Sequence, residues 1–344
     1  MNGNKYLRWL ASETQTQWWH DSADRDELQA SLSNGAVGAT TNPLLVKLTL
    51  FSRPDAWSAV LSGMPSGLGG EHKAESIMEK ITLKLAEILR PIYETTNGAK
   101  GYACAQVNPC LQGNSGAMLD MAKRLNKWAP NISVKLPATA AGLDTLEECA
   151  ALGIPLTSTV SFTVPQALAI GERYAKGMAR AKQAGIKPAH CHAVLMVGRL
   201  DDYLRDVAMD SKSQVKEEDV VQSGLAVAKR AYQLFADRGY EAVIMPAALR
   251  GVYHMRELAG AKMVVSTAPK IQGLLGELEG RFEERIHIPI APEVIRRLES
   301  LPEFIRAYEP NGMKPEEFIA YGCTQRTLSQ FTEAGWVPLE GYKI

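Results

Sequence analysis

A lysine inside an apolar segment is the residue of this chain with the clearest chemical potential. Lys135 lies in residues 132–139, Ile-Ser-Val-Lys-Leu-Pro-Ala-Thr, a run typical of a strand buried in a parallel sheet. Burial penalises the charged ammonium group, so it lowers the lysine pKa and makes the neutral amine available. A neutral amine can attack a carbonyl carbon and form a Schiff base. Lys135 is therefore a candidate nucleophile.

The alternation of side chains along a strand predicts where this amine points. Successive residues face opposite sides of a sheet, which places Ser133 and Lys135 opposite Ile132, Val134 and Leu136. We expect the apolar face to meet helices and the face with Lys135 to point into the interior of a barrel.

Polar residues recur where other predicted strands end. Cys104 and Gln106 share the inward face of one strand, and Thr157 and Thr159 share a face of another. The remaining ones are Asp21 and the run Thr40-Thr41-Asn42. Active sites of (β/α)8 barrels lie at the carboxyl ends of the strands. An acid, amides, hydroxyls and an amine are thus expected on one rim.

The order of apolar and amphipathic segments predicts the fold. Eight strand-like runs alternate with helical ones, which favours an α/β protein of the (β/α)8 TIM-barrel type over an open doubly wound sheet. No Gly-x-Gly-x-x-Gly loop follows the first run, which weakens that alternative. The predicted strands are 18–21, 36–41, 102–107, 132–136, 155–160, 192–197, 242–245 and 262–266. The predicted helices include 25–33, 74–93, 116–128, 145–152, 165–184, 222–237 and 253–258.

The length of the chain fits one barrel domain over residues 1–344, with a core at 18–275 and extra helical segments at both ends. Residues 276–344 are expected to be helical and to pack on the barrel or at a subunit interface. The insertion at 50–99 and this tail are the places where a homo-oligomer interface could lie.

Composition excludes several classes of function. Lysine plus arginine and aspartate plus glutamate each number 38, so no charge bias points to nucleic acid or to a membrane surface. No apolar run is long enough to span a bilayer, and the first residues lack the apolar core of a signal peptide. The five cysteines are scattered without a Cys-x-x-Cys pair, so we expect reduced thiols and no metal site. We expect a cytoplasmic protein.

Several segments, in this order and spacing, resemble those of the transaldolase family, which includes transaldolases and the smaller fructose 6-phosphate aldolases. They are Asp-Ser-Ala-Asp at 21–24, Gly-Ala-Thr-Thr-Asn-Pro at 38–43, Val-Lys-Leu-Pro-Ala-Thr at 134–139 with Gly142, and the stretch 153–167. The resemblance covers about residues 18 to 275.

The resemblance implies class I aldolase chemistry without a cofactor, on a (β/α)8 barrel, with a sugar phosphate as substrate. Lys135 looks like the Schiff-base lysine that attacks the ketone carbon. Asp21 resembles the acid/base that moves the C4 hydroxyl proton as the C3–C4 bond breaks. Gln106 and Thr159 resemble residues that orient a catalytic water.

The same resemblance implies the substrate contacts. Asn42 looks like the residue that holds the hydroxyls of the bound three-carbon unit. Arg199 and Arg250 resemble the pair that binds the phosphate, a task that suits bidentate guanidinium groups. The other residues expected to contact substrate are Thr41, Thr157 and Met196.

This sequence departs from the family pattern at five positions, three of them among the residues just named. Gln106 stands where transaldolases have a glutamate and the small aldolases a glutamine. Met196 replaces the tyrosine of the small aldolases and the phenylalanine of transaldolases. Thr157, Ala248 and Val194 replace an asparagine, a serine and another polar residue. The pocket is therefore expected to be more apolar, and its substrate could differ from fructose 6-phosphate.

Three functions remain open from the sequence. A transaldolase would transfer a three-carbon ketol unit to an acceptor, whereas an aldolase of the second type would cleave the ketose reversibly without one. Gln106 favours cleavage, and the longer chain favours transfer. The third is a sugar-phosphate-binding barrel with weakened catalysis, which the substitutions at Gln106, Met196 and Ala248 allow. Retention of Lys135 and Asp21 argues against that third function.

Other candidate residues have plainer interpretations. His192 shares the inward parity of Met196 but lies deeper, so we expect a core histidine. His20 has the opposite parity to Asp21 and should face the helices. Arg199 could form surface ion pairs with the aspartates at 201 and 202, although its position just after a predicted strand favours phosphate contact.

Overall fold

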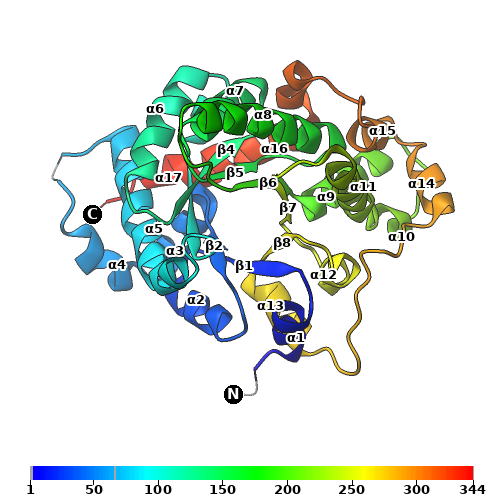
Figure 1. The fold of residues 1–344 in the computed structure, drawn as a ribbon, viewed down its shortest axis with the longest axis horizontal. Coiled ribbons are helices and arrows are strands. Elements are labelled where there is room, and N and C mark those ends of the chain that lie inside the picture. The colour runs from blue at the N-terminus through cyan, green and yellow to red at the C-terminus, as the bar shows by residue number, and fades with distance from the viewer. Residues whose placement is uncertain (1–2, 66, 344) are drawn as a thin grey trace.

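The computed structural model describes residues 3–65 and 67–343. Eight parallel strands follow one another in the order β7-β6-β5-β4-β3-β2-β1-β8, and β7 and β8 also lie in contact. Because the last strand pairs with the first, the sheet curls into a ring with helices around it (Figure 1). The predicted (β/α)8 barrel with helical extensions is confirmed, and the open doubly wound sheet is excluded.

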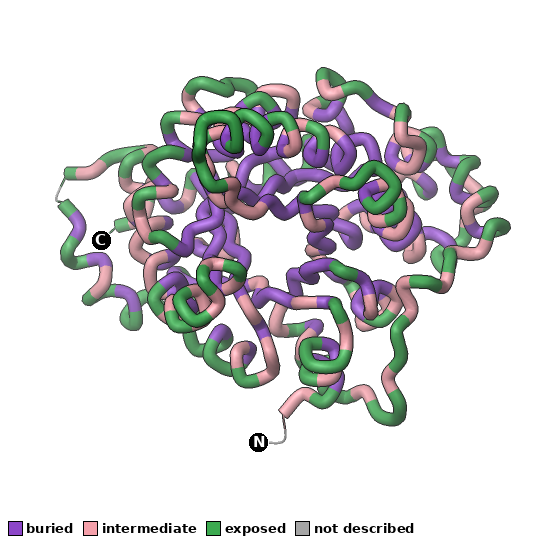
Figure 2. The backbone as a smooth tube through the Cα atoms, viewed as in Figure 1, coloured by how far each residue is buried: buried purple, intermediate pink, exposed green. Residues whose placement is uncertain are grey.

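All eight predicted strands are present, with ends that differ from the prediction by at most two residues. They are β1 (Gln17–Asp21), β2 (Gly38–Thr40), β3 (Tyr102–Gln106), β4 (Ile132–Pro137), β5 (Leu156–Thr159), β6 (Cys191–Leu195), β7 (Val243–Pro246) and β8 (Val264–Thr267). Both faces of most of them are buried, as Figure 2 shows for the ring, and this burial explains why their sequences are mainly apolar.

Helices follow every strand. After β1 to β4 come α2 (Arg25–Leu32), α3 (Pro43–Ser52), α4 (Pro54–Leu61), α5 (Gly70–Thr95), the 3₁₀ turn η1 (Pro109–Leu111), α6 (Ser115–Asn126) and α7 (Ala140–Ala151). After β5 to β8 come α8 (Val164–Gln183), α9 (Val197–Asp210), α10 (Glu217–Val220), α11 (Ser223–Arg238), α12 (Val252–Leu258) and α13 (Pro269–Gly276). Before β1, α1 (Lys5–Glu13) packs against α13. Among the described residues, no helix is long and apolar enough to cross a membrane.

Short polar side chains set the start of the helices that leave the carboxyl ends of the strands. Asn42, Thr139 and Thr163 each accept a hydrogen bond from a backbone amide in the first turn of α3, α7 and α8. Pro43 and Pro165 occupy the first positions of α3 and α8, where a missing amide costs nothing. The Thr-Asn-Pro run therefore ends β2 and begins α3 within a few residues.

The predicted strand 192–197 was too long. β6 ends at Leu195 and α9 begins at Val197, so Arg199 lies in the first turn of a helix and not directly after a strand. The apolar residues at 195–197 continue the strand pattern because all of them are buried, and burial alone does not distinguish the last turn of a strand from the first turn of a helix.

The C-terminal segment crosses the side of the barrel where the strands end. It comprises α14 (Pro292–Leu298), α15 (Pro302–Tyr308), η2 (Pro315–Ala320), α16 (Gly322–Ser329), the π-helical turn η3 (Gln330–Trp336) and α17 (Val337–Glu340). Its successive elements contact α10, α11, α9, α3 and α5, so it runs from one side of the ring to the other (Figure 1). Since α3 and α9 start right after β2 and β6, α16 and η3 lie near the strand ends.

Two glycines on neighbouring helices provide a test of how closely α7 packs on β4. A Cβ at Gly142 would overlap the carbonyl oxygen of Pro137, whereas a Cβ at Gly116 would meet nothing closer than 3.6 Å. We expect Gly142→Ala to destabilise the protein by about 1–3 kcal/mol because the backbone must shift. Gly116→Ala should be neutral or stabilising by up to about 1 kcal/mol.

Urea unfolding followed by circular dichroism measures both variants against the parent protein. A lower midpoint for Gly142→Ala alone supports the close packing. Equal midpoints for the two variants would contradict it.

Candidate active site

Lys135 lies near the carboxyl end of β4, with its side chain inside the barrel. The side chain is buried, and its Nζ donates a hydrogen bond to the backbone carbonyl of Thr41 at 3.1 Å. In the sheet register, Lys135 stands between Gln106 on β3 and Thr157 on β5. The inward orientation predicted from strand alternation is confirmed.

The surroundings of Lys135 favour its neutral amine. Burial is the largest influence and lowers the pKa of Lys135 below its usual value. Cys104 and Asp21 act in the opposite direction with smaller effect, and the Arg199 cation adds to the lowering. A primary amine whose pKa is lowered mainly by burial has the property that Schiff-base formation requires.

Asp21 ends β1 and faces the same cavity as Lys135. Its Oδ1 accepts a hydrogen bond from Thr40 Oγ1 at 2.7 Å, and Thr40 Oγ1 lies 2.5 Å from Ser266 Oγ on β8. Thr40 and Ser266 therefore hold the carboxylate in place. Thr40 is one of the polar residues that the sequence placed on the rim, whereas Ser266, one residue before the end of β8, was not predicted.

Gln106 and Thr159 flank Lys135 on the neighbouring strands. Gln106 is buried, and its Oε1 has no hydrogen-bond partner within the described residues. Thr159 and Met196 line the cavity of Lys135, with Thr159 Oγ1 4.0 Å from the Met196 sulfur. A buried amide oxygen without a partner costs free energy, so this position suits a bound water or a substrate hydroxyl.

The residues expected to contact substrate divide into two groups. Asn42 lines the cavity, but its Oδ1 already caps α3, which leaves its amide nitrogen for a ligand. Thr41 uses its hydroxyl on the carbonyl of Cys104 and offers its own carbonyl to Lys135. Thr157 is fully buried and bonds to Ser133 Oγ at 2.8 Å, one layer below the cavity. Of these three residues, only Asn42 lines the cavity.

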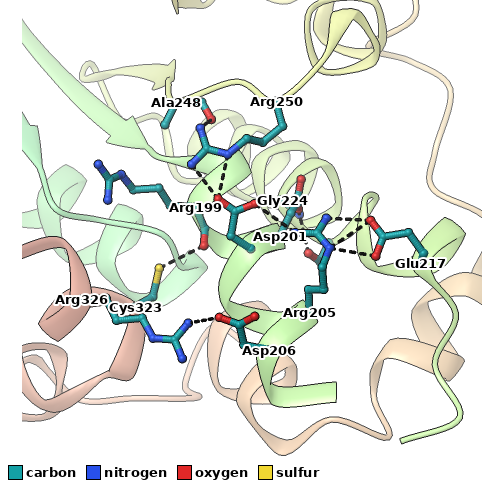
Figure 3. A network of polar contacts seen from close by, with 12 residues as sticks. Arg199, Asp201, Arg205, Asp206, Glu217, Gly224, Ala248, Arg250, Cys323 and Arg326 are labelled. Atoms are coloured by element: carbon teal, nitrogen blue, oxygen red, sulfur yellow. Dashed lines mark hydrogen bonds and ion pairs between the residues drawn. The ribbon is translucent and has the colours of Figure 1, made fainter. Parts of the chain in front are cut away.

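Arg199 and Arg250 line the cavity, and Figure 3 shows the polar contacts around both side chains. Arg250 makes the ion pair with Asp202, at 2.7 Å. Arg199 instead donates to Gln330 Oε1 at 2.6 Å and to Thr327 Oγ1 at 3.4 Å, both on the C-terminal segment. The surface ion pair considered for Arg199 is therefore made by Arg250, because α9 turns Arg199 toward the cavity and Asp202 away from it.

A buried acid and imidazole support the loop that carries Arg250. His254 Nδ1 accepts a hydrogen bond from the Arg250 backbone amide at 3.1 Å, and its Nε2 lies 3.0 Å from Asp201 Oδ2. Asp201 Oδ1 accepts from Ser223 Oγ and from the Gly224 amide. Asp201 lies on α9 and His254 on α12, so no local pattern in the sequence predicts that they pair.

The loop after β7 also adopts a restricted backbone conformation. Ala248 has φ of +55°, in the left-handed region that residues with a Cβ seldom occupy, and its carbonyl accepts from Arg250 Nη1 at 3.2 Å. A Cβ at Gly198 would overlap that same carbonyl. The close approach of α9 to this loop therefore needs glycine, and it brings the two arginines to one rim.

The histidines predicted to be structural lie away from the cavity. His20 faces α2 and α13, with its Nδ1 2.9 Å from Ser31 Oγ, and burial lowers its pKa to about 4. His192 packs edge-on against Trp19 in the barrel interior, with ring centroids 4.8 Å apart. Within residues 3–65 and 67–343, no three histidine, cysteine or acidic side chains gather as they would around a metal ion.

The protein is thus a (β/α)8 barrel with a buried lysine on its fourth strand, and sequence comparison identifies its family. A model of the transaldolase/fructose-6-phosphate aldolase family matches residues 18–280. The chain belongs to that family, which comprises class I transaldolases and aldolases, as its motifs predicted.

Curated relatives are distant. Transaldolase 2 of Streptomyces coelicolor is 29% identical over 245 residues, which cover 67% of this chain and 64% of that protein. A transaldolase of Thiobacillus denitrificans is 26% identical over 231 residues, 64% of each chain. The chain thus matches slightly less than two thirds of the length of these relatives.

The lowered pKa of Lys135 predicts a dependence of stability on pH. An unfolded lysine has a pKa of about 10.4, so below that pH the unfolded chain binds a proton that the folded site binds less readily. We expect Lys135→Met to stabilise the protein at neutral pH, by about 1.4 kcal/mol for each unit of pKa lowering. The gain should shrink as the pH rises from the folded pKa toward about 10.

Urea unfolding at about pH 7, 8.5 and 10 measures this gain. Lys176→Met, whose side chain is 54% exposed, serves as the control and should show no such trend. A gain for Lys135→Met that stays constant across the range would contradict a lowered pKa.

Proposed function

We propose that this protein is a Schiff-base-forming transaldolase-like enzyme, which transfers or cleaves a three-carbon ketol unit of a sugar phosphate or a close analogue. The observation that carries the proposal is the buried amine of Lys135, which faces the Asp21 carboxylate across one cavity at the carboxyl ends of the strands. Membership of a family of class I transaldolases and aldolases supports it.

The chemistry begins at Lys135. Its neutral Nζ attacks the ketone carbon, and loss of water from the carbinolamine leaves an iminium ion. Asp21 then takes the proton of the C4 hydroxyl, and the electrons of the C3–C4 bond pass to the iminium nitrogen. An aldehyde leaves and an enamine remains on Lys135. Thr40 and Ser266 keep the Asp21 carboxylate oriented during this step.

The enamine has two fates. In transfer, it attacks the carbonyl of an acceptor aldose, Asp21 returns the proton, and water releases the new ketose. In cleavage, the enamine is protonated and water releases the three-carbon ketone. We assign Gln106 and Thr159 to the water that these steps need, since Gln106 Oε1 is buried without a partner in the described part of the chain.

The substrate phosphate belongs at Arg199 and Arg250. Both arginines line the cavity of Lys135. The side-chain hydrogen bonds of Arg199 go to two neutral residues, Thr327 and Gln330. Asn42 contributes its amide nitrogen to the hydroxyls of the three-carbon unit. Thr41 accepts the hydrogen bond of Lys135 and Thr157 bonds to Ser133, so we assign neither of them to substrate contact. Met196 makes the cavity wall beside Thr159 apolar.

Borohydride trapping tests the Schiff base. Intact mass after reduction with fructose 6-phosphate should show one three-carbon or six-carbon adduct on the parent protein. Lys135→Met should show none, because Lys135 carries the only amine among the described residues that line the cavity. Peptide mapping should locate the adduct at Lys135.

Lys84→Met, at a partly exposed lysine of α5 that pairs with Glu87, is the matched control and should trap as the parent does. Failure of the parent protein to trap any of a panel of ketoses, or trapping by Lys135→Met, would refute the proposal.

Reversible cleavage is the second candidate function, and Gln106 beside Lys135 is the observation that favours it. An amide cannot relay a proton through water as a glutamate can. If cleavage dominates, fructose 6-phosphate should yield free dihydroxyacetone without an acceptor, and erythrose 4-phosphate should not accelerate its consumption. If transfer dominates, product should form only with the acceptor present.

Gln106→Glu sharpens this assay. The glutamate should raise the ratio of transfer to cleavage by at least about tenfold, because a well-placed general acid/base contributes roughly 10²–10⁴-fold. An unchanged ratio would remove Gln106 from the water-handling role.

A further inference from the structure

A second cavity adjoins that of Lys135, on the outer side of the two rim arginines. Its main lining residues are Arg199, Arg250, Arg326, Tyr203, Thr327 and Gln330. Arg199 and Arg250 line both cavities, so these two side chains form the boundary between them. The second cavity therefore lies next to the proposed phosphate position.

Charge in this cavity is unevenly compensated. Arg250 pairs with Asp202 and Arg326 pairs with Asp206, as Figure 3 shows for Arg326. Arg199 has no carboxylate within ion-pair distance in the described part of the chain, and its buried Nε has no hydrogen-bond partner there. Burial and the nearby Arg250 cation lower the pKa of Arg199. A largely buried cation without an anion is costly, which indicates that a ligand supplies the negative charge.

The wall opposite the barrel belongs to the C-terminal segment. Arg326 and Thr327 lie on α16, and Gln330 begins η3, so one short stretch places three polar groups around Arg199. The stretch is firmly anchored. Phe331 is buried with its ring 5.4 Å from the Arg199 guanidinium, and Cys323 Sγ donates to the Arg199 carbonyl at 3.4 Å.

Gln330 has the closest contact with Arg199, at 2.6 Å between Oε1 and Nη2. A neutral amide there orients the guanidinium and leaves its positive charge uncompensated. A glutamate of the same shape would instead neutralise Arg199 and repel a bound anion. The choice of glutamine at this position therefore keeps the site receptive to an anion.

We propose that the C-terminal segment forms the outer wall of the anion site, where Gln330 and Arg326 are specificity-determining residues for the phosphate group of the substrate. The phosphate sits at Arg199 and Arg250, faces the second cavity, and meets Arg326 across it. The inference rests on the proposed function for the identity of the substrate, but the anion site itself can be tested without any reaction.

Gln330→Glu is the decisive variant because it changes charge with little change of shape. Borohydride trapping is measured against concentration for fructose 6-phosphate and for fructose. We expect the half-saturating concentration of fructose 6-phosphate to rise about tenfold or more, and that of fructose to change far less. Equal changes for the two ketoses, or no change for either, would overturn the proposal.

Calorimetric titration with inorganic phosphate separates this proposal from the proposed function. The parent protein should bind phosphate, Gln330→Glu should bind it about tenfold more weakly, and Arg326→Gln should bind it several-fold more weakly. If no ketose traps but these phosphate results hold, the Schiff-base function fails and the anion site stands. If ketoses trap but Gln330→Glu binds phosphate like the parent, the role of the C-terminal segment fails.

Gln183→Glu is the matched control. It makes the same substitution at an exposed position at the end of α8, and α8 runs from the strand carboxyl ends to the other side of the barrel. It should leave phosphate binding unchanged. Unfolding midpoints of all the variants show whether any loss of binding follows from loss of folding.

Discussion

The cost of placing an ammonium group inside a barrel is the constraint on which the rest of this structure depends. Among the described residues, Lys135 has one direct hydrogen-bond partner, the neutral carbonyl of Thr41. Asp21, which lines the same cavity, is held by Thr40 and Ser266 instead. A direct ion pair would have stabilised the charged amine and raised its pKa. The arrangement leaves Lys135 and Asp21 without a direct ion pair, as the proposed Schiff-base chemistry requires.

The barrel holds Lys135 in this position. Lys135 belongs to β4, which pairs with β3 on one side and β5 on the other, so sheet hydrogen bonds fix its backbone on both sides. Deeper in the barrel, the hydroxyl of Thr157 forms hydrogen bonds with Ser133 and Cys104. Helix caps at Asn42, Thr139 and Thr163 end the strands abruptly, and the polar rim therefore lies at one level.

Positive charge is arranged differently at the rim. Arg250 is supported twice, by Asp202 at its guanidinium and by His254 and Asp201 through its backbone amide. Arg199 is supported by neutral groups of the C-terminal segment. The positive charge of Arg250 is thus compensated by a carboxylate, whereas that of Arg199 is left for a ligand. The neutral partners of Arg199 come from α16 and η3, which lie outside the region that the family model matches.

The sequence by itself determined the barrel, its eight strands and the inward direction of Lys135 and Asp21, because burial and alternation along a strand are local patterns. The family motifs added the likeness to transaldolases for the same reason, since they are short and contiguous. Only the tertiary structure decided that α9 already begins at Val197, that Asp202 pairs with Arg250, and that Thr157 lies below the cavity. It also brought Gln330 to Arg199 and His254 to Asp201. These contacts join residues far apart in the chain or on different helices, and their geometry depends on how helices pack, which no local periodicity encodes.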